Sequence, residues 1–149
     1  MAAITFTPPE LDAATSLLQD LIRLDTTNPP GHEQAAIALL ERHCRTIGLE
    51  TLVVGAHNER PNLVARWSAD PARRTGRPLI LSGHVDCVPA DPARWTHDPW
   101  SGHHDGTHIW GRGAIDMKGF VAMAFAVIAK LKRENVSLTR DLLFVVVSD

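Results

Sequence analysis

The chain has 149 residues, of which 44% are hydrophobic and 21% charged, and its formal net charge is −2. This composition predicts an ordinary globular domain, or part of one, with a hydrophobic core. Balanced charge gives no reason to expect nucleic acid or a membrane surface as a partner. No secretory signal opens the chain and no apolar run approaches the roughly 20 residues that span a bilayer, so we expect a cytoplasmic protein. Cys44 and Cys87 are too few for a disulfide framework and are interpreted as free structural thiols.

Two helices are expected first. Apolar residues recur at three- and four-residue spacing over residues 11–24, which indicates an amphipathic helix. Residues 25–31, which include two prolines and a glycine, end it. A second helix is expected from about residue 32 to residue 47, closed by Gly48.

The middle of the chain has the pattern of β-structure. Residues 50–54, 62–67 and 79–82 are short β-type runs separated by loops rich in Gly, Pro, Asn and Asp. The polar stretch that then reaches Gly106 is longer than a usual connection, which suggests a functional loop. A short strand is expected at residues 107–110.

The last part of the chain combines a helix with a strand. A glycine turn at residues 111–113 leads to Asp116 and to an apolar helix at about residues 118–134. Residues 142–147 are continuously apolar, which predicts a strand covered on both faces. We therefore expect an α/β fold in which helices flank a mixed, largely parallel sheet, with the functional site at the strand ends.

His84 and Asp86 directly follow an apolar strand, and residues two apart in extended chain point to the same side. A histidine that binds a metal commonly donates its other ring N–H to a carboxylate, so His84 is a candidate metal ligand with Asp86 behind it. The same pair also fits a strand-end histidine satisfied by a nearby acid. Asp116 favours the metal site, because it too follows a short strand and ligands gather at the carboxyl ends of strands.

The turn Gly111-Arg112-Gly113 has a second interpretation as part of a dinucleotide fingerprint. Asp116 occupies the position of the third glycine, where its carboxylate would repel a pyrophosphate. A tight turn with a helix-capping aspartate is a further interpretation.

Three ordered motifs, LSGHVDCVP at 81–89, WTHDPW at 95–100 and WGRGAIDMKG at 110–119, together with DTTNPPG at 25–31, resemble the zinc metallopeptidase family of aminoacylase, acetylornithine deacetylase, succinyl-diaminopimelate desuccinylase and glutamate carboxypeptidase. The resemblance implies a phosphorylase/hydrolase-like catalytic domain that holds two zinc ions, with cobalt as a possible substitute. It implies hydrolysis of an amide bond in an N-acyl amino acid or small peptide. In such a site His84 binds one zinc, Asp116 bridges both, and Asp86 is a catalytic residue that orients His84.

The family pattern also implies residues beyond this sequence. It places a glutamate base and a glutamate ligand directly after an aspartate that ends a strand, and here that aspartate is Asp149. A further acidic ligand, a second histidine and an inserted dimerisation or lid domain are likewise expected elsewhere. We therefore expect residues 1–149 to be the N-terminal part of a truncated catalytic domain, inactive alone, with a homodimer possible only for the full-length protein. The alternatives are a non-catalytic, degenerate domain and a dinucleotide-binding domain.

Residues around these motifs have plainer interpretations. Trp95 and Trp100 are expected to pack the long loop beside the site. Arg112 fits both a backbone anchor and a contact to a substrate carboxylate. Histidines of the same region are expected in a solvated loop and not in a further metal site: His97, His103, His104 and His108.

Overall fold

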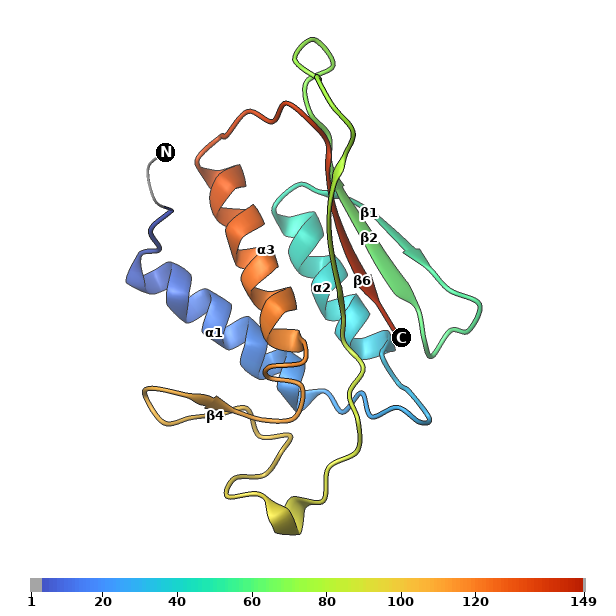
Figure 1. Ribbon diagram of the computed structural model, residues 1–149, viewed down its shortest axis with the longest axis vertical. Helices are drawn as coiled ribbons and strands as arrows, with labels where there is room; N and C mark the ends of the chain where they lie inside the picture. Colours follow the sequence, from blue (N-terminus) through green and yellow to red (C-terminus); the bar gives the residue numbers. More distant parts are fainter. Residues whose placement is uncertain (1–3, 149) are drawn as a thin grey trace.

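The computed structural model describes residues 4–148, which form a mixed sheet, flanking helices and a small hairpin (Figure 1). The helices are α1 (Pro8–Arg23), α2 (Gln34–Thr46), α3 (Lys118–Arg133) and the short 3-10 helix η1 (Pro92–Arg94). The main sheet contains β1 (Glu50–Val54), β2 (Asn62–Trp67), β3 (Leu79–His84) and β6 (Leu142–Val147). The hairpin pairs β4 (His103–His104) with β5 (Ile109–Trp110).

The strands of the main sheet lie in the order β1-β2-β6-β3. β2 pairs antiparallel with both β1 and β6, whereas β3 pairs parallel with β6. The expected mixed sheet with flanking helices is confirmed, but among the described strands it is not largely parallel, because only β3 and β6 pair in parallel. β6, the last of the described strands along the chain, thus occupies an interior position between β2 and β3.

One face of this sheet carries the core. Buried side chains of β2 and β6 belong to a single apolar cluster with residues of all three α-helices. β6 alternates: Leu142, Phe144 and Val146 are buried, whereas the intervening Leu143, Val145 and Val147 are only half-buried. The expectation of cover on both faces of this strand is therefore not met within residues 4–148, because the described helices all pack on the same side.

Helix α1 begins earlier than its apolar periodicity predicts. Thr7 is the N-cap and Pro8 is the first helical residue, where a missing N–H is tolerated. The Glu10 carboxylate accepts a hydrogen bond from the backbone N–H of Thr7 at 2.5 Å. This return contact is half of a capping box, so the start of the helix is set by polar residues ahead of the apolar stripe.

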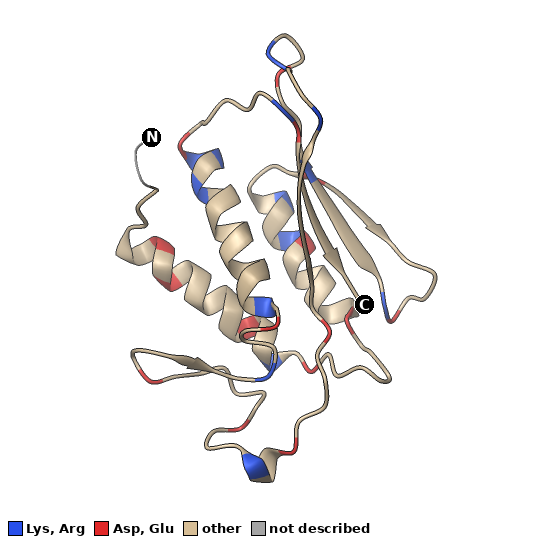
Figure 2. Cartoon of the chain, viewed as in Figure 1, with Lys and Arg blue, Asp and Glu red and all other residues tan. Residues whose placement is uncertain are grey.

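Charged residues lie mainly in loops and near helix ends, and the strands carry few of them (Figure 2). The loop between β2 and β3, at the top of the view, is rich in arginine and also contains Asp70 (Figure 2). Among residues 4–148, the helices are too short or too polar to cross a bilayer. Cys44 and Cys87 are buried free thiols, as expected, and burial raises the pKa of Cys44 to about 12.

Candidate metal centre

The end of β3 approaches the start of α3, and this approach depends on Gly83. A Cβ at Gly83 would lie 3.0 Å from Val121 Cγ2 and 3.1 Å from Phe120 Cδ1, both on the first turns of α3. Because glycine lacks that atom, β3 continues past Ser82, where the predicted strand ended, and closes with His84. The last residue of the strand therefore lies beside the loop that carries Asp116.

The imidazole of His84 lies between two carboxylates. Its Nδ1 is 2.8 Å from Asp86 Oδ1, and its Nε2 is 3.2 Å from Asp116 Oδ1. The contact to Asp86 Oδ1 is electrostatic, and the hydrogen-bond neighbour of Nδ1 is the Asp86 backbone carbonyl oxygen at 3.3 Å. The Asp86 side chain is 13% exposed and that of Asp116 is 86% exposed. The Nδ1 side of the ring is therefore sheltered, and the Nε2 side is open to solvent. The structure brings together all three residues singled out from the sequence.

This arrangement suits part of a zinc site. The Nε2 side of the His84 ring offers an imidazole nitrogen and the Asp116 carboxylate, which are both ordinary zinc ligands. Within residues 4–148, no group of three or more His, Cys, Asp or Glu side chains is placed to hold a metal ion. A zinc ion normally takes four ligands, so the described residues supply a fraction of a complete set.

A cleft of about 410 Å³ opens next to His84 and Asp116, and Arg112 and Trp95 form part of its wall. The guanidinium carbon of Arg112 lies 5.2 Å from the centre of the Trp95 ring, a cation–π contact. Arg112 Nη2 donates to the Pro89 carbonyl oxygen at 3.3 Å. These contacts favour the anchoring interpretation of Arg112, because they join the glycine turn to the long loop.

Lys118 is a structural residue that the sequence analysis did not single out. It is fully buried at the start of α3, and its Nζ donates to the carbonyl oxygens of Leu21 and Leu24 at 2.9 Å each. These carbonyls lie at the C-terminal end of α1, where helices leave acceptors unsatisfied. Burial lowers the pKa of Lys118. The contact ties α1 to the helix that begins two residues after Asp116.

The histidines of the long loop form a separate cluster. The rings of His97 and His103 are stacked with centroids 4.0 Å apart, and His97 also meets the edge of Trp110 at 5.1 Å. Trp110 Nε1 donates to Asp105 at 2.8 Å, and this bond is the main cause of a lowered pKa at that carboxyl. His103, His104 and His108 are exposed, as expected for a solvated loop, whereas His97 is half-buried.

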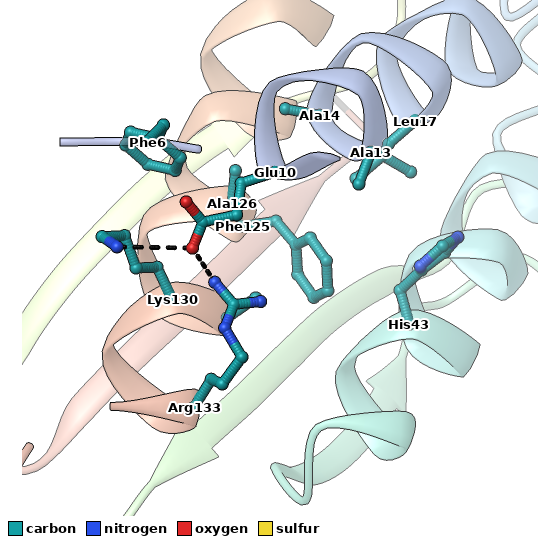
Figure 3. Close-up of a pocket in the computed structure, with 11 residues that line it drawn as sticks. Phe6, Glu10, Ala13, Ala14, Leu17, His43, Phe125, Ala126, Lys130 and Arg133 are labelled. Carbon is teal, nitrogen blue, oxygen red and sulfur yellow. Dashed lines mark hydrogen bonds and ion pairs between the residues drawn. The ribbon is translucent and has the colours of Figure 1, made fainter. Parts of the chain in front are cut away.

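A second cavity, of about 100 Å³, lies near the C-terminal end of α3, away from Asp116 (Figure 3). Its charged groups are already paired: the Glu10 carboxylate contacts Lys130 at 3.3 Å and also contacts Arg133. The rest of its wall is largely apolar, including Phe6 and Phe125. With its charged groups paired, this cavity is interpreted as a packing gap between helices.

Comparison with known proteins gives consistent matches. Residues 80–149 match the family described as Peptidase family M20/M25/M40. A succinyl-diaminopimelate desuccinylase from Paracoccus denitrificans (strain Pd 1222) is 46% identical over 110 residues, which make up 73% of this chain and 27% of that protein. The chain therefore spans well under half the length of this relative.

Solved structures share the fold. An M20 family metallo-carboxypeptidase from Sulfolobus solfataricus superposes with a TM-score of 0.77 at 21% identity, over 95% of this chain and 31% of that one. A dinuclear metal binding peptidase of the M20 family from Bacillus subtilis gives a TM-score of 0.66 at 14% identity, over 94% of this chain and 36% of that one. At these identities the structural likeness concerns the fold alone.

Proposed function

Because this chain belongs to the peptidase family M20/M25/M40, we propose that the complete protein is a zinc-dependent amidohydrolase acting on an N-acyl amino acid or small peptide. The observation that carries the proposal is the position of the His84 ring, with a sheltered carboxylate on one nitrogen and an open carboxylate beside the other. The desuccinylase name of the 46% identical relative supports an N-acyl substrate.

We assign one role to each of the three residues. His84, which lines the cleft, would hold one zinc ion through Nε2. Asp116 would help to hold both zinc ions, a role that suits a carboxylate 86% exposed and close to that nitrogen. Asp86 stays behind the ring, where it holds the imidazole in the orientation and tautomer that a ligand needs.

The metal ions, when bound, would polarise the scissile carbonyl and make a bound water acidic enough to attack it. Within the described residues, the chain prepares this chemistry by orienting the His84 ring and by shaping the cleft wall with Arg112 and Trp95. We propose that the general base and the remaining ligands lie outside residues 4–148, in the rest of a catalytic domain of the relatives' length. By itself this part of the chain should be inactive and should bind zinc weakly.

The proposal is tested on the complete gene product that carries this sequence, assayed with N-succinyl and N-acetyl amino acids and with dipeptides after loading with zinc or cobalt. Replacing His84 or Asp116 with Ala should abolish turnover. Asp86→Ala should lower it by about 10- to 100-fold, as outer-shell changes do. His97→Ala, outside the cleft, is the matched control. Absence of turnover with every substrate and both metals would count against the hydrolase and favour a non-catalytic domain.

The dinucleotide alternative loses its structural basis. That fingerprint requires the glycine turn to follow a strand of the main parallel sheet. Here the turn follows β5, which pairs with β4 in the small hairpin.

A further inference from the structure

The segment that carries Asn28 runs beside the residues that follow β3. Thr27 and Cys87 form a parallel bridge, the backbone N–H of Asn28 donates to the Cys87 carbonyl at 2.9 Å, and the Cys87 N–H donates to the Thr26 carbonyl at 3.0 Å. The Thr26 hydroxyl donates to the Val85 carbonyl at 2.5 Å. These contacts join two parts of the chain about 60 positions apart. The backbone of Asn28 is thereby held against the backbone of the metal motif.

The far side of the same turn is held as well. Gly31 adopts a left-handed φ of 82°, and its N–H donates to the Thr27 carbonyl at 2.9 Å. A Cβ at Gly31 would lie 2.5 Å from Arg60 Nε and 2.9 Å from Glu33 Oε1, so the turn passes close to this ion pair. The Glu33 side chain is fully buried and its Oε2 lies 3.2 Å from Arg60 Nε. With both of its ends fixed, the turn presents the Asn28 side chain in one place.

In this position the Asn28 side chain contacts the Asp86 carboxylate. Asn28 Nδ2 donates to Asp86 Oδ2 at 3.3 Å, while Asp86 Oδ1 lies 2.8 Å from His84 Nδ1. Each oxygen of the carboxylate therefore has its own neighbour. A carboxylate contacted at one oxygen can rotate about its last bond, but contact at both oxygens fixes its plane. Asn28 thus contacts the oxygen that does not face the histidine and restricts the plane of the carboxylate.

The position of this plane matters because acceptors on both sides of the ring compete for the His84 proton. Nδ1 faces the Asp86 backbone carbonyl oxygen at 3.3 Å as well as the Asp86 carboxylate, and Nε2 faces Asp116. Asp116 lies 3.2 Å from Nε2 but is 86% exposed, so water weakens its attraction; Asp86 is sheltered, and its interaction is less screened. A proton on Nδ1 leaves the Nε2 lone pair free for a cation. We infer that Asn28 is a positioning residue of the site: its amide holds the Asp86 carboxylate so that neutral His84 carries its proton on Nδ1. The inference takes the ligand role of His84 from the proposed function.

The test measures the tautomer in the metal-free 149-residue chain. Long-range ¹H–¹⁵N NMR of ¹⁵N-histidine-labelled protein at about pH 8, where an ordinary imidazole is neutral, distinguishes protonated from unprotonated ring nitrogens. We expect the wild-type His84 to show a protonated Nδ1. Asn28→Asp, which keeps the size but replaces the donor with an acceptor, and Asn28→Ala should both give a mixture with Nε2–H. Gln19→Ala is the control, because it removes another side-chain amide hydrogen bond, the 2.7 Å bond to the Gly102 carbonyl, outside the cleft.

Two results would overturn the inference: a wild-type ring protonated on Nε2, or an unchanged Nδ1–H tautomer in both folded Asn28 variants. Amide spectra report folding, and if one variant does not fold the other decides the question. Zinc titration of the complete gene product separates this inference from the proposed function. Its Asn28→Asp variant should bind zinc about tenfold more weakly than wild type, at the lower end of the range for outer-shell changes. A complete wild-type protein that binds no zinc would count against the metal site, while the tautomer result would still decide the role of Asn28.

Discussion

Replacing Lys118 with Met removes an ammonium from the junction of α1 and α3 while keeping most of the side-chain volume. Two hydrogen bonds to the carbonyls of Leu21 and Leu24 are lost. Hydrogen bonds from charged donors contribute about 1.5–3 kcal/mol each, so the gross loss is about 3–6 kcal/mol. Relief from burying the charge, which is also what lowers the Lys118 pKa, offsets part of it. We expect the free energy of unfolding to fall by about 2–4 kcal/mol.

Urea unfolding followed by circular dichroism measures this change as a shift in midpoint at constant slope. In thermal unfolding the same change corresponds to about 5–15 °C for a chain of this size. Lys132→Met is the matched control, since Lys132 also donates to a carbonyl, that of Gly48 at 3.3 Å, but from a partly exposed site. The control should lose less than about 1 kcal/mol. Equal stabilities for the Lys118 and Lys132 variants would refute the idea that Lys118 ties the two helices together.

Three further predictions concern other parts of the fold. Gly83→Ala should lower the free energy of unfolding by about 1–3 kcal/mol through crowding against α3, measured by thermal unfolding, whereas Gly76→Ala, with no neighbour closer than 3.4 Å, should have a smaller effect. The pKa of Asp141 is lowered, mainly because its carboxylate accepts a hydrogen bond from the backbone N–H of Ala69. The stabilisation of the fold by Asp141 is therefore complete above the unfolded-state pKa and is lost as pH falls through the folded-state pKa. Asp141→Asn should therefore be less stable than wild type in urea at neutral pH, and the difference should shrink in acid; a constant difference would refute this. Cys44 should resist iodoacetamide at about pH 8 until the chain unfolds, because the thiolate is the reactive form, and mass spectrometry that finds rapid labelling of the native protein would contradict the burial.

The sequence predicts some elements to the residue and others only in part. β1, β2 and β6 have the expected bounds, because apolar, β-branched runs between turn residues favour strands. β3 runs past its expected end, because Gly83 and His84 pair with Val146 and Val147 of β6 and the ladder outweighs the weak strand preference of glycine. A continuous apolar run is compatible with a strand covered on one face or on both. The half-exposed face of β6 could therefore not be predicted from the sequence.

The same division applies to the site. His84, Asp86 and Asp116 lie in short motifs at strand ends, so local spacing and family resemblance bring them forward together. Asn28 and Lys118 act across 58 and up to 97 sequence positions, and no local period links such residues. Their contacts depend on how packing places α1 and the turn at residues 25–31. The spacing of residues along a single sequence does not reveal that placement.

The place of β6 also has a consequence for the order of folding during synthesis. β2 and β3 have no edge in common and are joined through β6, which is synthesised after both of them. Until residues 142–147 emerge, the β1–β2 hairpin and β3 have no shared partner, and the apolar sides of the helices have only part of a sheet to cover. Strand pairings between residues this distant in sequence form late in folding. Partly folded states with exposed apolar surface then persist for longer and are prone to aggregation. The nascent chain should therefore depend on chaperones at least until β6 has emerged, and β6 should be among the last of the described elements to gain protection from hydrogen exchange.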